Sequence, residues 1–316
     1  MKRLVIIVPC FNEEEVLPTS ANELYGVLNS LIINAKVSDN SKILFVNDGS
    51  GDKTWEIIRE LTTRDKHFAG INLARNVGHQ SALLAGIEAT VDSYDISITI
   101  DADLQDDTTV IAQMVEENLQ GADIVYGVRS DRKSDSWFKR FTAQSFYKIM
   151  SFLGADTVYN HADFRLLSKR AMKQLLSFKE RNMFLRGIVP KIGYKTAKVF
   201  YERKARIAGK TKYPLKKMIS FAWDGITSLS VKPISLITGL GLFVVLASVI
   251  AFIYIFISFI SDSTNAGWTS LMASIWLLGG LQLFSIGIIG QYIGKTYLET
   301  KERPRFIVEE YISNEE

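Results

Sequence analysis

Short apolar stretches alternate with helix-like stretches through about the first 130 residues, and this alternation constrains the fold more than any other feature. Some stretches are short, apolar and stopped by turn or polar residues, which is typical of buried strands: 3–9, 42–47, 68–74, 96–100 and 123–128. The segments between them carry apolar residues at helical spacing: 13–33, 53–63, 80–91 and 108–119. This order predicts an α/β fold, with a mostly parallel sheet and helices on both faces.

The fourth predicted strand ends in a cluster of acids, Asp101-Ala102-Asp103-Leu104-Gln105-Asp106-Asp107. Open α/β sheets bind ligands beyond the carboxyl ends of their strands. If the strand continues through the motif, Asp101 and Asp103 face the same side. Paired carboxylates suit Mg²⁺ or Mn²⁺, and such a cation can hold a diphosphate. The motif therefore predicts a metal site, with an acidic turn that caps the next helix as the alternative.

Polar loops also follow the first three strands. They read Pro9-Cys10-Phe11-Asn12-Glu13, Asn47-Asp48-Gly49-Ser50-Gly51-Asp52 and Ala74-Arg75-Asn76-Val77-Gly78-His79. Because the carboxyl ends of parallel strands meet at one edge of a sheet, we expect the four loops to converge on one site. Asp48 has turn capping as its alternative role. For His79 a structural or sugar-contacting role is favoured over that of a base.

Two long runs without charge set the C-terminal part of the chain apart. Residues 233–260 and 267–294 contain no Asp, Glu, Lys or Arg. Each run exceeds the roughly 20 residues that a membrane-spanning helix needs. Because residues 261–266 form a short polar link, the runs predict a two-helix transmembrane hairpin rather than a pair of buried helices.

Charge orients this hairpin. Lys and Arg are frequent before and after it, whereas the link contains none, so the positive-inside rule predicts a multi-pass protein of the cell membrane with both ends cytoplasmic. We expect four segments: a cytosolic domain over 1–212, an interfacial amphipathic helix over 213–232, the hairpin over 233–295 and a cytosolic tail over 296–316. The net charge of +3 is too small to indicate a nucleic-acid partner, and the single cysteine excludes a disulfide within the chain.

The loop sequences together resemble the signature blocks of family 2 glycosyltransferases with a Rossmann-like GT-A fold. Within that family the chain is most similar to the polyisoprenyl-phosphate branch, which includes dolichyl-phosphate mannose synthase and bacterial undecaprenyl-phosphate glucosyltransferases. The C-terminal hairpin is typical of the bacterial members. The chain contains no Arg-Trp pair of the kind found in processive synthases, which argues against a polymerase.

The resemblance implies roles for the loop residues. The expected nucleotide-sugar pocket consists of Pro9, Asn12, Glu13, Asp48 and Asp101. The expected metal and diphosphate group consists of Asp101, Asp103 and Gln105, of which the last two are favoured as direct ligands of Mg²⁺ or Mn²⁺. This cation would neutralise charge on the departing UDP.

The resemblance also marks an acceptor-side motif, Asn160-His161-Ala162-Asp163-Phe164-Arg165. Asp163 is expected at the reacting centre, together with Asp103, as a base or as a group that orients the acceptor. A phosphate monoester is largely ionised near neutral pH and needs little deprotonation. An ion pair of Asp163 with Arg165 or Arg170 is the structural alternative. Cations for the diphosphate and the lipid phosphate are expected among Arg129, Arg140, Arg165, Arg203, Arg206 and Lys210.

These features together predict the transfer of a single sugar from a UDP-sugar to undecaprenyl phosphate at the cytoplasmic membrane face. The resemblance implies that the reaction inverts the anomeric carbon. The product would serve a cell-wall or surface glycan, with a separate flippase as a partner. Two alternatives stay open: transfer to another lipid such as diacylglycerol, and a non-catalytic nucleotide-binding membrane scaffold. The sugar stays open as well. Glycines in the run 267–294 permit close helix packing, in a homo-oligomer or within the hairpin.

Overall fold

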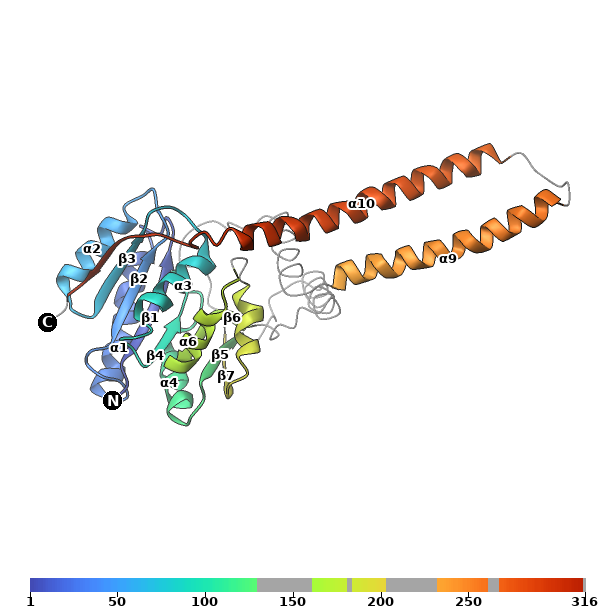
Figure 1. Ribbon diagram of the computed structural model, residues 1–316. Helices are drawn as coiled ribbons and strands as arrows, with labels where there is room; N and C mark the ends of the chain where they lie inside the picture. Colours follow the sequence, from blue (N-terminus) through green and yellow to red (C-terminus); the bar gives the residue numbers. More distant parts are fainter. Residues whose placement is uncertain (130–160, 181–183, 203–231, 261–266, 315–316) are drawn as a thin grey trace.

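The computed structural model describes residues 1–129, 161–180, 184–202, 232–260 and 267–314 of the 316-residue chain. At its centre lies an eight-stranded sheet with the strand order β7-β5-β6-β4-β1-β2-β3-β8. Figure 1 shows this sheet with helices packed against it and two long helices that extend away from it. β6 and β8 run antiparallel to their neighbours, and the remaining strands all point in one direction.

The alternation that the sequence predicts is confirmed. The strands are β1 (Leu4–Cys10), β2 (Lys42–Asn47), β3 (Phe68–Leu73), β4 (Ile96–Thr99) and β5 (Ile124–Arg129). The helices between them are α1 (Leu17–Ile33), α2 (Thr54–Arg64), α3 (His79–Thr90) and α4 (Ile111–Leu119), the last preceded by a 3₁₀ turn, η1 (Thr108–Val110). Asp107 caps that turn by accepting a hydrogen bond from the backbone N–H of Thr109 at 3.2 Å.

One strand has no counterpart in the predicted alternation. β6 (His161–Ser168) lies between β4 and β5 and is antiparallel to both. Because of this direction, the start of β6 lies at the carboxyl ends of its two neighbours. The chain continues through α6 (Lys169–Ser177), α7 (Leu185–Ile188), a 3₁₀ turn η2 (Val189–Ile192) and β7 (Thr196–Tyr201), which pairs with β5.

The sheet separates two hydrophobic layers. In β1, Leu4, Ile6 and Val8 face a layer formed with α1, α2 and α4, whereas Val5 and Ile7 face a layer formed with α3, α6 and α7. Both faces of β1 are therefore buried, which explains its continuous apolar sequence, since strands of parallel sheets are covered on both sides.

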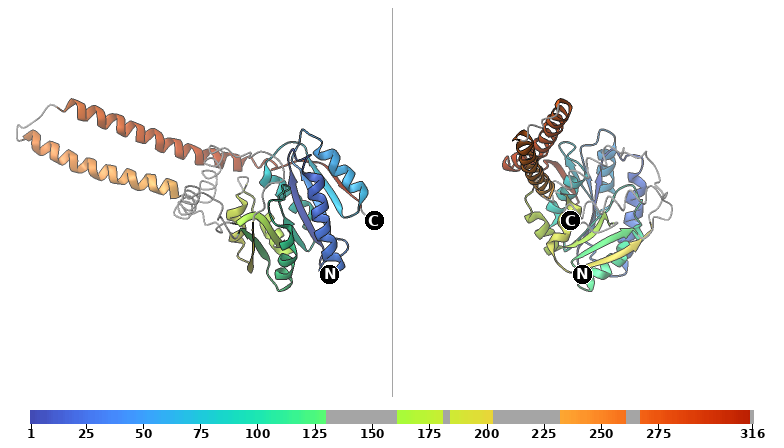
Figure 2. Two further views of the ribbon diagram at one scale, coloured as in Figure 1. Left: turned by 180° about the vertical axis from the view of Figure 1, so that it is seen from behind. Right: turned by 90° about the vertical axis from the view of Figure 1, so that its right-hand side faces the viewer.

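The two uncharged runs form α9 (Lys232–Ile260) and α10 (Trp268–Thr300). Figures 1 and 2 show these helices side by side, projecting away from the sheet. Within the described residues, no helix combines the length and the hydropathy that crossing a membrane requires. The expected interfacial helix lies almost wholly outside the described residues, as does the stretch 261–266.

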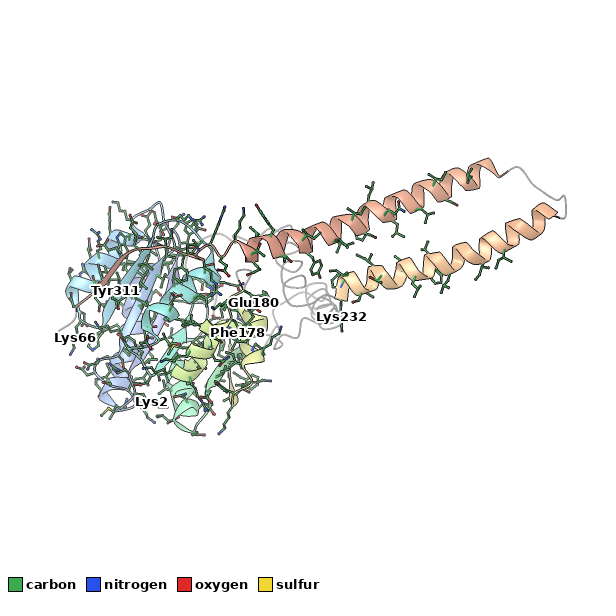
Figure 3. All side chains as sticks on the ribbon, viewed as in Figure 1. Lys2, Lys66, Phe178, Glu180, Lys232 and Tyr311 are labelled. Atoms are coloured by element: carbon green, nitrogen blue, oxygen red, sulfur yellow. The ribbon has the colours of Figure 1, made fainter. Side chains whose placement is uncertain are left out.

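The segment after α10 differs from the expected tail. It returns to the sheet and adds β8 (Val308–Ser313) antiparallel to β3, where it becomes the outer strand. Figure 3 labels Tyr311 on this strand. The six residues of β8 show no clear alternation of apolar and polar side chains and have no predicted strand beside them in the chain, so they resemble a polar tail.

Gly49 is held in a conformation that only glycine tolerates well. Its φ is +65°, and a Cβ atom at this position would lie 2.5 Å from the backbone nitrogen of Asn76. The loop after β2 therefore packs directly against the backbone of the loop after β3. Gly51, in the same loop, has open space around the position of a Cβ atom.

We expect Gly49→Ala to lower the free energy of unfolding by about 2–4 kcal/mol, because it adds backbone strain and a clash with neighbouring backbone. Urea titration of the purified protein in detergent measures this. Gly51→Ala is the matched control and should change the free energy by less than about 1 kcal/mol. Equal losses in the two variants would contradict the close approach of the loops.

Candidate active site

The carboxyl ends of β3, β2, β1 and β4 lie next to one another in the sheet, so their loops meet at one edge. Hydrogen bonds join the first two loops. The N–H of Asn12 donates to Ser50 Oγ at 3.0 Å, and the N–H of Gly51 donates to Asn12 Oδ1 at 2.9 Å. The N–H of Glu13 donates to Thr54 Oγ1 at 3.0 Å. The structure thus brings together the residues Asn12 and Glu13 with the loop after β2, while their contact with a nucleotide stays a prediction.

Asp48 holds the third loop. Its carboxylate accepts hydrogen bonds from the N–H groups of Val77 at 2.7 Å and Gly78 at 3.0 Å. Burial raises the pKa of Asp48 above its usual value, although the two N–H donors oppose this shift. This geometry matches the alternative in which Asp48 caps a turn, except that the capped N–H groups belong to the loop after β3. Pro9 is buried within β1, one residue before the loop.

The acidic motif is not part of a strand, because β4 ends at Thr99 and Leu104 has a φ of +52°. Burial nevertheless alternates along it. Ala102, Leu104 and Asp106 are buried, whereas the residues between them are partly exposed: Asp101, Asp103 and Gln105. The expected common face of Asp101 and Asp103 required a strand that is absent, but both side chains are partly exposed.

His79 lies between Asp101 of the acidic motif and Asp163 of β6. Its Nε2 atom is 3.4 Å from Asp101 Oδ1 and 3.7 Å from Asp163 Oδ2. Burial raises the pKa of Asp101, and the neighbouring carboxylates of Asp106, Asp163 and Asp103 add to this shift while His79 opposes it. The sequence pointed to His79 only as a loop residue, because its position between two distant acids is a property of the fold.

Asp163 stands on β6 between two arginines. Arg165 donates to Oδ1, and the guanidinium of Arg186 donates to Oδ2 at 3.0 Å. Burial alone would raise the pKa of Asp163, but the charges of Arg186 and Arg165 outweigh it and hold the pKa well below its usual range. The ion-pair alternative with Arg165 is therefore present, whereas Arg170 pairs with Asp123 instead. Whether Asp163 takes part in the reaction stays a prediction.

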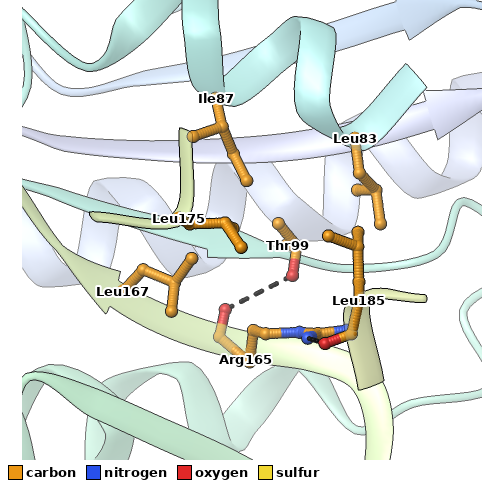
Figure 4. Close-up of a pocket in the computed structure, with 7 residues that line it drawn as sticks. All are labelled: Leu83, Ile87, Thr99, Arg165, Leu167, Leu175 and Leu185. Carbon is orange, nitrogen blue, oxygen red and sulfur yellow. Dashed lines mark hydrogen bonds between the residues drawn. The ribbon is translucent and has the colours of Figure 1, made fainter. Parts of the chain in front are cut away.

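The buried position of Arg165 contradicts the prediction that its side chain contacts a phosphate. Its side chain is only 2% exposed, and it donates to Asp163 and to the carbonyl oxygen of Leu185 at 3.4 Å. Figure 4 shows it in a small internal pocket lined largely by leucine and isoleucine side chains, with Thr99 donating to its carbonyl oxygen at 3.5 Å. Because the guanidinium is buried and already paired, Arg165 supports Asp163 from inside the domain.

The sequence patterns did not identify Arg186 as a residue of the site. Its side chain is 34% exposed and lies beside Asp163 at the same edge as Asp101. Gln80 positions the short helix α7 by accepting a hydrogen bond from the N–H of Leu185 at 2.9 Å. A single Arg-Gly pair between apolar residues carries no signal by itself, so only the docking of α7 onto the start of α3 identifies this cation.

Arg129 ends β5 and joins a second polar cluster. It donates to Asp106 Oδ1 at 3.1 Å and to the Tyr201 hydroxyl at 3.3 Å, and that hydroxyl donates to Asp106 at 2.6 Å. The cluster ties the acidic motif to the ends of β5 and β7. The contact of Arg129 with a lipid phosphate stays a prediction. The remaining predicted cations lie outside the described residues: Arg140, Arg203, Arg206 and Lys210.

The comparison with known proteins identifies the family. Residues 5–176 match the family model described as Glycosyl transferase family 2. The chain belongs to glycosyl transferase family 2. A relative named Uncharacterized glycosyltransferase YkoT, from Bacillus subtilis (strain 168), is 52% identical over 313 residues, which are 99% of this chain and 93% of the relative.

A second family member, named Bactoprenol glucosyl transferase, from Shigella phage SfX, is 38% identical over 311 residues, or 97% of this chain and 98% of the relative. The resemblance to the polyisoprenyl-phosphate branch of family 2 is therefore confirmed, and the protein is a glycosyltransferase. Among solved structures, glucosyl-3-phosphoglycerate synthase from Mycobacterium tuberculosis, in complex with Mn²⁺, UDP and phosphoglyceric acid, aligns with a TM-score of 0.46 and 17% identity over 72% of this chain and 77% of its own.

A divalent cation at this edge of the sheet would have few ligands from the protein. In the part of the chain that the structure describes, no group of three or more His, Cys, Asp or Glu side chains is arranged to hold a metal. A cation that carries a nucleotide needs only one or two protein carboxylates, because phosphate oxygens and water complete its coordination. Asp101 and Asp103, both partly exposed, fit such a shared site.

We expect Asp163→Asn to lower the free energy of unfolding at pH 7 by about 3–5 kcal/mol, because it leaves buried Arg165 with an uncompensated charge. Glu116→Gln makes the same chemical change in an exposed pair with Lys36 and should cost less than about 1 kcal/mol. Urea titration of both variants measures the difference.

The cost of Asp163→Asn should also depend on pH. Because the folded-state pKa of Asp163 is depressed, its carboxylate stabilises the fold above the unfolded-state pKa of about 4, and this contribution is lost as the pH falls below that value. The gap between wild type and Asp163→Asn should therefore narrow below about pH 4. A gap that stays constant would contradict the ion pair.

Proposed function

We propose that the protein transfers one sugar from a UDP-sugar to a polyisoprenyl phosphate such as undecaprenyl phosphate. We infer the class of acceptor from the Asp163 carboxylate, whose pKa two arginines hold well below its usual range. Such a carboxylate is a weak base, and a hydroxyl acceptor such as diacylglycerol would need a stronger one. A phosphate monoester is already largely ionised near neutral pH and needs no base.

The relative named Bactoprenol glucosyl transferase supports this proposal, because its similarity extends over 97% of this chain and includes both long helices. Its name favours glucose as the sugar, so UDP-glucose is the first donor to test. A non-catalytic scaffold is disfavoured, because it would have no need of the acids that converge at the sheet edge.

In the proposed reaction an acceptor phosphate oxygen attacks the anomeric carbon of the donor. The new carbon–oxygen bond forms opposite the leaving group, so the anomeric configuration inverts. The bond to UDP breaks, and its electron pair goes to the terminal phosphate of UDP. Mg²⁺ or Mn²⁺ held by Asp103 and Gln105, with Asp101 beside them, would neutralise that charge when bound.

This chain's own cations would bind the two phosphate groups. Arg186 lies at the partly exposed edge beside Asp163, where it can donate to an acceptor phosphate, and its planar fork suits that geometry. Asp163 would orient this arginine rather than remove a proton. Arg129 and the basic stretch 203–212 are the other proposed phosphate contacts.

We further propose that α9 and α10 form a transmembrane hairpin that holds the site at the cytoplasmic membrane face. The support is the absence of charge over 233–260 and 267–294 and the exposure of large apolar side chains on both helices: Leu242, Phe243, Leu283 and Phe284 are 62%, 67%, 74% and 63% exposed. Soluble monomers rarely expose apolar surface on this scale. The stretch 213–232 would lie at the interface, and a separate flippase would move the lipid-linked sugar toward a cell-wall or surface glycan.

We expect purified full-length protein in detergent, given undecaprenyl phosphate, Mn²⁺ and radiolabelled UDP-glucose, to form a labelled lipid-soluble product. EDTA should abolish the product, and added Mn²⁺ should restore it. Asp103→Asn should lower kcat about 100-fold or more, because charge on the departing UDP loses its partner. Asp107→Asn, in the same acidic run, should change kcat less than about threefold, because Asp107 caps a helical turn.

The assay also separates the alternatives. No product from UDP-glucose, UDP-N-acetylglucosamine or UDP-galactose would contradict the proposal as a whole. A product formed with diacylglycerol but not with undecaprenyl phosphate would contradict the acceptor class, and Asp163→Asn should then abolish activity more completely.

The topology predicts which positions a membrane-impermeant maleimide can reach in intact cells. In a Cys10→Ser background, Ser263→Cys in the link between the helices should be labelled, because the link is expected outside the cytoplasm. Asn40→Cys, on an exposed turn before β2, should be labelled only after the cells are permeabilised. The opposite labelling pattern would contradict the orientation.

A further inference from the structure

The C-terminal strand β8 is built into the donor side of the sheet. It pairs with β3 from Ala69–Ser313 to Leu73–Val308, and the N–H of Ala74 donates to the carbonyl oxygen of Ile307 at 3.0 Å. In Figures 1 and 3 the segment runs from the end of α10 along the outer edge of the sheet beside β3. β8 therefore covers the edge of the strand whose loop carries His79.

Two amide side chains, one on β3 and one on β2, connect β8 to the loop after β2. Asn72 donates from Nδ2 to Glu309 Oε2 at 2.9 Å, and its Oδ1 accepts from Asn47 Nδ2 at 2.7 Å. Asn47 Oδ1 in turn accepts from the N–H of Ser50 at 3.3 Å. The result is a continuous relay from the C-terminal strand to the loop after β2.

This relay reaches the expected nucleotide pocket. Ser50 Oγ accepts from the N–H of Asn12 at 3.0 Å, so the last member of the relay holds the loop after β1. Asn12 needs such support, because its φ of +54° is unfavourable for a residue with a side chain.

The relay has a direction, and Glu309 sets it. A side-chain amide donates at one end and accepts at the other, so it can be turned over without a change in shape. An ionised carboxylate only accepts, so Glu309 fixes which end of Asn72 faces it. Asn72 then presents an acceptor to Asn47, and Asn47 presents an acceptor to the N–H of Ser50.

We propose that Glu309 is a positioning residue for the nucleotide of the donor, acting through Asn72 and Asn47 on the loops after β2 and β1. This inference rests on the proposed function, because that function assigns these loops to UDP. It makes the segment beyond α10 a part of the donor site, although the segment lies outside the residues that match the family model.

The adjacent acid supplies a matched control. Glu310 does not bond to Asn72 but pairs with Arg59 on α2 at 2.5 Å. Glu309→Gln and Glu310→Gln therefore remove one negative charge each from neighbouring positions of the same strand. Only the first removes the group that sets the direction of the relay.

The experiment is calorimetric titration of the full-length chain in detergent with UDP in the presence of MnCl₂. Glu309→Gln should weaken UDP binding about three- to tenfold, the size expected when one charge-assisted hydrogen bond is lost. Glu310→Gln should leave it within about twofold of wild type. The KM for undecaprenyl phosphate should not change in either variant.

A swapped pair separates positioning from a general structural effect. Asn72→Asp alone places two carboxylates together and should weaken UDP binding more than Glu309→Gln does. In the double variant Glu309→Gln with Asn72→Asp, the new amide donates to the new carboxylate, which still accepts from Asn47. UDP affinity should return to within about threefold of wild type.

The outcomes distinguish this inference from the proposed function. Wild type that binds UDP but transfers no sugar overturns the proposed function alone. Unchanged UDP affinity in Glu309→Gln, an equal loss in Glu310→Gln, or no recovery in the swapped pair overturns the positioning role. Wild type that does not bind UDP overturns both.

Discussion

The buried ion pair between Arg165 and Asp163 is the interaction on which the site depends. Arg165 lies inside the domain with Asp163 and a backbone carbonyl as its hydrogen-bond partners, so the two charges stabilise each other where neither could be buried alone. The start of β6 lies beside the end of β4 through strand pairing, and Thr99 Oγ1 donates to the carbonyl oxygens of Asp163 and Arg165. Asp163 is thereby held near His79 and Asp101, and Arg186 completes the cluster at the partly exposed edge.

The sheet divides the site into two halves. β3, β2, β1 and β4 carry the loops proposed to bind the donor, and hydrogen bonds through Asn12 and Asp48 join the loops after β1, β2 and β3. β6, β5 and β7 carry the part proposed to bind the acceptor, where Asp106 ties Arg129 and Tyr201 to the acidic motif. The two halves meet between β4 and β6. The strand order reverses next to this boundary, between β1 and β4, which is the usual position of a ligand in an open α/β sheet.

Local patterns predicted the part of this architecture that neighbouring residues determine. The alternation of strands and helices and the convergence of the loops at one edge of the sheet both follow from short-range sequence. The insertion of β6, the role of Arg186 and the pairing of β8 with β3 do not, because each depends on residues far apart in the chain. Arg165 was misassigned for the same reason: sequence shows that an arginine is present but not that its guanidinium is buried.

The position of β8 at the end of the chain has a consequence for biosynthesis. A ribosome releases β1 to β7 before the two long helices, and β8 only after them. The outer edge of β3 therefore stays unpaired until β8 emerges, and an unpaired edge strand is a template for aggregation. A chain that stops before residue 308 would keep the acids at the carboxyl ends of the strands but would leave the outer edge of β3 unpaired. The order of synthesis therefore links completion of the sheet to completion of the two long helices.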